Sequence, residues 1–253
     1  MSVLENISIV LTRPKYSENI GAAARAMKNM GFSKLIVVSP QNYDFDNANK
    51  VATHESVDIL NKAEFTDSLK EALLNFNYII GTTARLGKNR QGVYNPSEMA
   101  EKLRSISKKN LAAIVFGPED KGLQNDDLQL CDAIINIPTS SHLSSINLAQ
   151  SVMIICYELF KTSQETIEKP IPQLARRYEL EGMYSQLKEI LIKINYIRPD
   201  NPDYWLNNFR HFFNRFCLYS REVYIIRGLC RQIEWYGNKR YNDALKERNE
   251  AEK

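Results

Sequence analysis

The sequence predicts an α/β protein with a parallel sheet that carries helices on both faces, followed by a small all-α extension. Up to about residue 160, short apolar runs alternate with amphipathic stretches, which is the pattern of βαβ units. From residue 178 onward, apolar residues recur only at helical spacing. We therefore predict an α/β domain over 1–160, a linker over 161–177 and a helical extension over 178–253.

Short runs rich in β-branched and other apolar residues are predicted as strands. Each run is almost wholly apolar, so we expect both of its faces to be covered, as in a parallel sheet flanked by helices. The predicted strands are Ile7–Leu11, Leu35–Val38, Tyr78–Ile80, Ala112–Phe116 and Ala133–Ile137.

Three helices are predicted between and after these strands. The first spans Glu18–Met30 and is ended by Gly31, a residue that favours the left-handed conformation after a helix. The second spans Pro96–Ser105, where Asn95 can cap the helix and proline suits the first turn. The third, Ile146–Phe160, has an apolar stripe at helical spacing.

The extension is predicted to be helical over Tyr178–Ile197 and again over Tyr204–Tyr236. The second region interleaves aromatic residues with arginines. Aromatic residues at helical spacing are more often core than base-stacking surface, so we expect Phe209, Phe212 and Phe216 to be buried.

Composition excludes several classes of protein. The 253 residues are 43% hydrophobic and 25% charged, which is ordinary globular usage. No run of about 18 apolar residues occurs, and the first residues lack the basic and apolar segments of a signal peptide. We therefore predict a cytoplasmic protein without a membrane segment.

The net charge of +3 is concentrated in the extension. Residues 1–160 contain 16 Lys and Arg against 17 Asp and Glu, whereas residues 161–253 contain 17 against 13. This bias is compatible with a polyanionic partner but is too small to identify one.

No metal site is predicted. The four cysteines form no CxxC pair, and with three histidines no zinc-binding set can be drawn along the sequence. We expect Cys131, Cys156, Cys217 and Cys230 to be buried, reduced thiols.

Turn residues indicate where a ligand binds. Gly81, Gly117 and Pro138 each follow a predicted strand, so three turns meet at the carboxyl edge of the sheet, where open α/β sheets bind their ligands. The sequence has neither the GxGxxG of dinucleotide-binding folds nor a GxxxxGK[ST] phosphate loop. A cofactor bound here must be held in another way.

Three motifs occur in order over the first 150 residues. The first runs from Asn19-Ile20-Gly21 to Arg25, and the second is Phe116-Gly117-Pro118-Glu119-Asp120-Lys121-Gly122-Leu123. The third joins Ile137-Pro138 to Ser144-Ser145-Ile146-Asn147-Leu148. As a set they resemble the signature motifs of the SPOUT superfamily of RNA methyltransferases, in its TrmH/TrmJ-type branch, which methylates ribose 2′-oxygens.

The resemblance to TrmJ-type tRNA methyltransferases extends over nearly the whole chain, because the helical extension also has a counterpart there. It implies a trefoil knot near the carboxyl end of the sheet domain, a homodimer, and S-adenosyl-L-methionine bound in the knot. It also implies a tRNA substrate, with the pyrimidine at position 32 of the anticodon loop as the methylated nucleotide.

The resemblance implies that three loops hold the cofactor. Glycine and small residues there permit close approach of backbone amides and carbonyls, and apolar side chains supply walls. Taken singly, the glycines and serines would be interpreted as turn and capping residues. The implied cofactor-binding residues are Thr82, Thr83, Ala84, Gly117, Glu119, Gly122, Leu123, Ile137, Ser144, Ser145 and Ile146.

The implied catalytic residues are Arg25, Asn19, Ser145 and Asn147. The family's catalytic arginine matches Arg25, and since a guanidinium keeps its proton, we expect it to orient phosphate and stabilise the developing oxyanion. The alternative interpretation is that Arg25 is a solvent-exposed helix residue without a role in catalysis. Ser145 and Asn147 can orient the hydroxyl or the cofactor, or simply cap the following helix.

Further cations are candidates for phosphate contacts at the same edge: Arg13, Lys15 and the loop Arg85–Arg90. Some TrmJ-type enzymes carry arginines where this chain has Pro118 and Asp120, so any RNA contact made by those arginines is absent here. Two alternatives stay open at this stage: methylation of another tRNA or rRNA nucleotide, and a non-catalytic RNA-binding protein.

Overall fold

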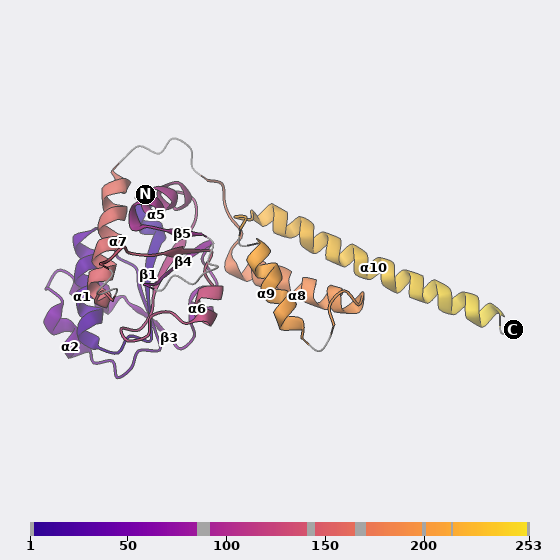
Figure 1. Ribbon diagram of the computed structural model, residues 1–253, viewed down its shortest axis with the longest axis horizontal. Coiled ribbons are helices and arrows are strands. Elements are labelled where there is room, and N and C mark those ends of the chain that lie inside the picture. Colours follow the sequence, from indigo (N-terminus) through magenta and orange to yellow (C-terminus); the bar gives the residue numbers. More distant parts are fainter. Residues whose placement is uncertain are drawn as a thin grey trace. The chain divides into compact units, whose positions relative to one another are not determined.

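The computed structural model describes residues 3–84, 92–140, 145–164, 171–198, 201–213 and 215–251. The chain divides into two compact units, residues 1–177 and 178–253, which are described separately (Figure 1). None of the described helices is long and apolar enough to cross a membrane.

Unit 1 is built on a seven-stranded sheet in the order β3-β2-β1-β6-β4-β7-β5, with every pairing parallel. In chain order its elements are η1 (Val3–Asn6), β1 (Ile7–Thr12), α1 (Ser17–Asn29), β2 (Leu35–Val38), α2 (Phe45–Val51), α3 (Val57–Asn61), β3 (Glu64–Thr66), α4 (Leu69–Ala72), β4 (Tyr78–Thr82), β5 (Val93–Tyr94), α5 (Pro96–Ile106), β6 (Ala112–Phe116), α6 (Asn125–Gln129), β7 (Ala133–Ile135) and α7 (Leu148–Ser163).

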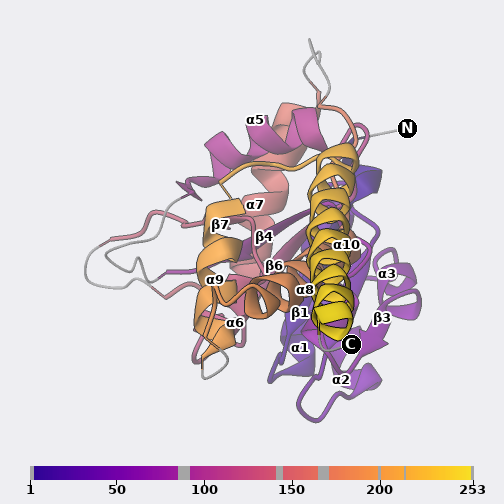
Figure 2. The ribbon, with the colours of Figure 1, turned by 90° about the vertical axis from the view of Figure 1, so that its right-hand side faces the viewer.

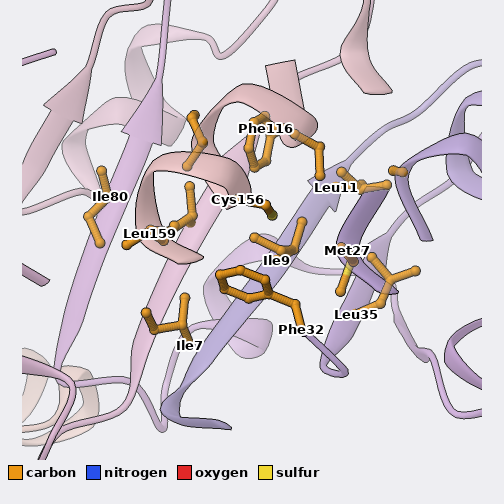
Figure 3. Packing of buried hydrophobic residues seen from close by; sticks show 14 of the residues in the cluster. Ile7, Ile9, Leu11, Met27, Phe32, Leu35, Ile80, Phe116, Cys156 and Leu159 are labelled. Carbon is orange, nitrogen blue, oxygen red and sulfur yellow. The ribbon is translucent and has the colours of Figure 1, made fainter. Parts of the chain in front are cut away.

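The predicted α/β class with helices on both faces is confirmed. Helices α1, α5 and α7 pack on one face, where Ile9, Leu11 and Phe116 meet Met27 and Cys156 (Figure 3). Figure 2 shows β6, β4 and β7 alongside these helices, and α7 contacts both α1 and α5. A second cluster of buried residues from α4 and the segment around α6 covers the opposite face. The central strands are therefore shielded from water on both sides.

Two helix ends that the sequence predicted from capping residues are found in the structure. Gly31 ends α1 with φ +75°, and Asn95 and Glu98 form a capping box at the start of α5. Two strands were not predicted: β3, which is partly exposed at the sheet edge, and β5, which has only two residues. Four helices, α2, α3, α4 and α6, were not predicted either, because they are too short to show a helical period.

Residues 171–177, within the segment predicted as a linker, pack against unit 1. Leu174 is buried, its backbone N–H donates to Asn110 Oδ1 and its carbonyl accepts from Asn77 Nδ2. Arg177 is 2% exposed and donates to the Leu130 carbonyl while pairing with Asp132. Asparagine amides thus satisfy backbone groups of a segment that has no regular structure of its own.

Unit 2 consists of α8 (Arg177–Lys193, of which Arg177 belongs to unit 1), α9 (Pro202–Phe213) and the 32-residue α10 (Ser220–Ala251). The guanidinium of Arg210 on α9 makes a two-pronged ion pair with Glu181 on α8 and lies 4.5 Å from the centre of the Tyr184 ring. Arg227 on α10 donates to Gln186 on α8. Two of the arginines that the sequence interleaves with aromatic residues therefore join helices of this unit.

The prediction that Phe209, Phe212 and Phe216 are buried is wrong for Phe212, on α9, and for Phe216, which follows that helix. They are 52% and 54% exposed and contact each other edge to face, whereas Phe209 is half-buried. The expected burial of all four cysteines is wrong at one position, because Cys217 is exposed whereas Cys131, Cys156 and Cys230 are buried. Helical spacing indicates which residues share a face but not whether another element covers that face.

Candidate functional site

A pocket of about 210 Å³ lies at the carboxyl edge of the sheet, where the sequence predicted a ligand. We call it the inner pocket. Its walls come from the segments that follow β4, β6 and β7 and from the start of α7. They are Thr82, Thr83, Ala84, Phe116, Gly117, Pro118, Glu119, Asp120, Lys121, Gly122, Ile135, Ile137, Ser145, Ile146, Leu148 and Ser151.

The loop after β6 can line this pocket because it has two glycines. A Cβ at Gly117 would lie 2.2 Å from the backbone of Gly122 and Leu123, so no other residue fits without moving the loop. Gly122 has φ +63°, and its N–H donates to the Pro118 carbonyl. The chain thus folds back on itself and presents backbone groups to the pocket at close range.

A second, more open depression adjoins the inner pocket, and we call it the outer hollow. It is lined by Tyr16, Glu18, Asn19, Glu119, Ser145, Ile146 and Asn147. Glu119, Ser145 and Ile146 line both spaces. A ligand in the inner pocket and another in the outer hollow would therefore meet at these three residues.

A chain of hydrogen bonds joins the three sequence motifs at this boundary. Asn147 Nδ2 donates to Asn19 Oδ1 at 3.1 Å, and Asn19 Nδ2 donates to Glu119 Oε1 at 2.8 Å. Glu119 Oε2 accepts from the Lys15 backbone N–H at 2.9 Å, and Asn147 Oδ1 accepts from the Ala149 N–H at 2.9 Å. Both ends of the chain are backbone donors, so neither amide can turn over without losing a partner.

The cations proposed from the sequence as phosphate ligands are paired with carboxylates. Arg13, whose φ is +52°, forms an ion pair with Asp127. Lys15 Nζ lies 2.6 Å from Asp120 Oδ2; this hydrogen bond raises the pKa of Lys15 and lowers the pKa of Asp120. These two cations hold the loop after β1 to the loop and helix after β6. The loop Arg85–Arg90 lies outside the described residues.

Arg25 lies apart from both spaces. It is exposed on α1, six residues beyond Asn19, and lines neither the inner pocket nor the outer hollow. Six residues of helix correspond to about 9 Å along its axis. Gly21, four residues before Arg25 on the same helix, packs closely against the backbone of Ala48 on α2.

Most of the cofactor-binding residues that the resemblance implied line the inner pocket, and Leu123 is the described exception. Leu123 is buried and packs on Gly81, and Ser144 lies outside the described residues. Tyr16 and Glu18 were missed; they lie three positions and one position before the first motif. Phe116 and Leu148 stand at the ends of the second and third motifs but were not among the implied cofactor residues, and Ile135 and Ser151 lie outside the motifs.

Within the described part of the chain, no three or more His, Cys, Asp or Glu side chains are grouped so as to hold a metal ion. Cys131 lies under Gly81, and burial raises the pKa of its thiol far above the ordinary value. It is therefore a packing residue, and the chemistry of the site rests on amide, hydroxyl, carboxylate and backbone groups.

Comparison with known proteins agrees with this geometry. Residues 6–157 match the SpoU rRNA Methylase family, and residues 178–248 match the tRNA methyltransferase TrmJ, C-terminal domain. The chain is 32% identical to the tRNA (cytidine/uridine/adenosine-2′-O-)-methyltransferase TrmJ of Pseudomonas aeruginosa, over 92% of this chain and 95% of that protein. It is 35% identical to the tRNA (cytidine/uridine-2′-O-)-methyltransferase TrmJ of Cronobacter sakazakii, over 92% of this chain and 97% of that protein.

Solved structures lead to the same result. The crystal structure of TrmJ from Z. mobilis ZM4 superposes with a TM-score of 0.78 at 30% identity and covers 90% of this chain and 98% of that one. A probable methylase family protein from Haemophilus influenzae gives a TM-score of 0.62 at 32% identity, over 93% and 98% of the two chains. With both units matched, the chain belongs to the SpoU methylase family, in its TrmJ branch.

Proposed function

We propose that the protein transfers a methyl group from S-adenosyl-L-methionine to the ribose 2′-hydroxyl of a tRNA pyrimidine, at position 32 of the anticodon loop. The observation that carries this is the hydrogen-bonded chain from Lys15 through Glu119 and Asn19 to Asn147. It brings the three motifs together where the inner pocket meets the outer hollow. The names of the TrmJ relatives support tRNA and the 2′-oxygen.

The inner pocket fits the cofactor. Gly117 and Gly122 leave backbone groups open to a ligand, and Ile135, Ile137 and Leu148 give apolar walls suited to an adenine ring. When bound, S-adenosylmethionine supplies an electrophilic methyl group on a sulfonium. The pocket's role is to hold that methyl group toward the residues shared with the outer hollow. Transfer then depends on how the methyl group and the ribose hydroxyl are positioned relative to each other.

The polar residues at the boundary then have separate tasks. Both carboxylate oxygens of Glu119 already accept hydrogen bonds, so we assign it to positioning Asn19 and not to removing a proton. The hydroxyl of Ser145 can both donate and accept, which suits contact with the ribose 2′-hydroxyl. Asn147 fixes the start of α7 and, through Nδ2, the amide of Asn19.

We assign Arg25 to a phosphate of the RNA next to the target nucleotide. The guanidinium is exposed on the same helix as Asn19, and an RNA strand extends well beyond the single ribose in the outer hollow. Arg25→Ala is therefore expected to bind S-adenosylmethionine normally and to lower methyl transfer at least about 100-fold. Calorimetric titration of the cofactor and initial rates with tRNA measure the two effects.

Lys28→Ala is the matched control, since Lys28 is an exposed cation on the same helix whose partner is Asp58. It is expected to leave transfer within about two-fold of the wild type, because exposed pairs contribute little. Normal methyl transfer by Arg25→Ala would show that Arg25 has no role in the reaction.

The protein is proposed to act as a homodimer in the cytoplasm, where its tRNA substrate is modified. Helix α7 supports the dimer, because Met153, Ile154, Tyr157 and Phe160 follow one another at helical spacing on a face that unit 1 leaves partly or largely exposed. A second copy of the chain can cover this stripe.

The function is tested by incubating the protein with labelled S-adenosylmethionine and unmodified total tRNA, followed by nuclease digestion and mass spectrometry. We expect a 2′-O-methylpyrimidine at position 32. A methyl group at another tRNA nucleotide would correct the position, and label in ribosomal RNA alone would replace the substrate. Cofactor binding without transfer to either RNA would favour a non-catalytic RNA-binding protein.

A further inference from the structure

We propose that Tyr16 stacks on the base of the nucleotide whose ribose is methylated. This rests on the proposed function, in which the outer hollow receives one nucleotide of a tRNA. Tyr16 lies outside the motifs and precedes the first of them by three positions. Its place in the structure, and not the motifs, indicates this role.

Tyr16 lines the outer hollow together with Asn19 and Asn147. The residues that the hollow shares with the inner pocket are Glu119, Ser145 and Ile146. A ribose that presents its 2′-hydroxyl to the methyl group must lie at this shared boundary. The base attached to that ribose then extends into the rest of the outer hollow, where Tyr16 is the aromatic residue among the described residues of the lining.

The ring is available to a ligand and has no other evident task. Tyr16 is 58% exposed. Tyr16 occupies the N-cap position of α1, where Ser, Asp or Asn is favoured because the side chain can accept a helix N–H, and it makes no such bond. A residue type that the local structure does not favour, at the rim of a ligand site, indicates a functional role.

The backbone on both sides of Tyr16 is held in place. Lys15 N–H donates to Glu119, and the Ser17 hydroxyl, which is buried, accepts from the Asp44 N–H at 2.9 Å. The carbonyl of Tyr16 itself accepts from the Asn19 N–H. With its backbone fixed and only two side-chain torsions, a tyrosine orders a stacking surface at low entropic cost.

The charges around the hollow favour a base over a phosphate. Glu18 places a carboxylate among the lining residues, and Glu119 places a second one at the boundary. Two acids repel a phosphate but not a neutral base or a ribose hydroxyl. Aromatic stacking also accepts any base, because every base has a π face. Stacking on Tyr16 would therefore hold a cytosine or a uracil equally well.

The test compares the wild type with Tyr16→Phe, Tyr16→Leu and Tyr16→Ala on two RNAs. One is the unmodified tRNA, and the other is the same tRNA with an abasic ribose, 2′-hydroxyl retained, at the methylated position. On the intact tRNA, kcat/KM is expected to stay within about two-fold for Tyr16→Phe and to fall about ten- to hundred-fold for Tyr16→Ala. Tyr16→Leu, which keeps apolar bulk without a π face, is expected to fall between them.

The abasic RNA separates stacking from a structural role. With the base absent, Tyr16→Ala and the wild type are expected to transfer at the same rate. An equal loss on both RNAs, or no loss on the intact one, would overturn the proposal. Calorimetric titration of S-adenosylmethionine and circular dichroism establish that each variant is folded. Failure of the wild type to methylate the intact tRNA would instead defeat the proposed function.

Discussion

Glu119 holds together loops that are far apart in the sequence, and its carboxylate is the only group type that satisfies both partners. Lys15 N–H and Asn19 Nδ2 each require an acceptor. In Glu119→Gln, one of them faces an NH₂ group instead. Asn19 cannot turn over to compensate, because Asn147 already donates to its oxygen while capping α7.

Glu119→Gln is therefore expected to lower methyl transfer at least about ten-fold and to cost about 1–3 kcal/mol in the free energy of unfolding. Initial rates with tRNA and urea denaturation followed by circular dichroism measure these effects. Glu101→Gln is the control: Glu101 is an exposed carboxylate on α5 that lines neither the inner pocket nor the outer hollow, so its loss should leave folding and transfer unchanged. If Glu119→Gln behaved like Glu101→Gln, the hydrogen-bonded chain would not organise the site.

The sequence predicted which residues belong to the site but not which of them are hydrogen-bonded to one another. Asn19, Glu119 and Asn147 stand in the motifs, yet the bonds between them join residues 100 and 128 positions apart. The pairing of Arg13 with Asp127, 114 positions away, was equally hidden, so Arg13 was predicted to be a phosphate ligand. Long-range pairing of charges depends on the fold, and no local pattern encodes it.

Among the elements, the contact between α1 and α2 is the one that glycine controls most directly. A Cβ at Gly21 would lie 2.0 Å from the Ala48 carbonyl oxygen, which is backbone and cannot turn aside. Gly21→Ala must push the two helices apart. We expect it to lower the free energy of unfolding by about 1–3 kcal/mol, as overpacking does.

Gly237→Ala, within α10, is expected to have the opposite sign. Nothing lies within 4 Å of its added Cβ, and alanine favours a helix over glycine by about 0.5–1 kcal/mol. Urea denaturation of each variant gives both values. A neutral Gly21→Ala would show that α1 and α2 are not in close contact in solution.

The elements that could be predicted are those that carry their own signal. The β1, β2, β4, β6 and β7 runs are buried on both faces, so apolar content alone reveals them. β3 is exposed at the edge of the sheet and β5 is two residues long. Both are strands because they pair with a neighbouring strand, and no local sequence pattern indicates that pairing. The implied knot remains a prediction.

At the scale of the whole molecule, the feature that needs a partner is the exposed apolar stripe on α7. Tyr157 is 50% exposed and Phe160 is 38% exposed, with Met153 and Ile154 half-buried beside them. An exposed apolar stripe of this kind usually marks an interaction site. We assign it to a second copy of the chain, related by a two-fold axis, so that the same stripe serves both protomers.

Tyr157→Glu should then separate the protomers, because dimer formation would bury a carboxylate against apolar side chains without a partner. Sedimentation velocity over a range of protein concentrations is expected to give about twice the 29.2 kDa chain mass for the wild type and the single chain mass for the variant. Lys62→Glu, which changes an exposed charge at the end of α3, should remain dimeric. A wild type that sediments as a monomer at every concentration would exclude the dimer, and a dimeric Tyr157→Glu would move the interface away from α7.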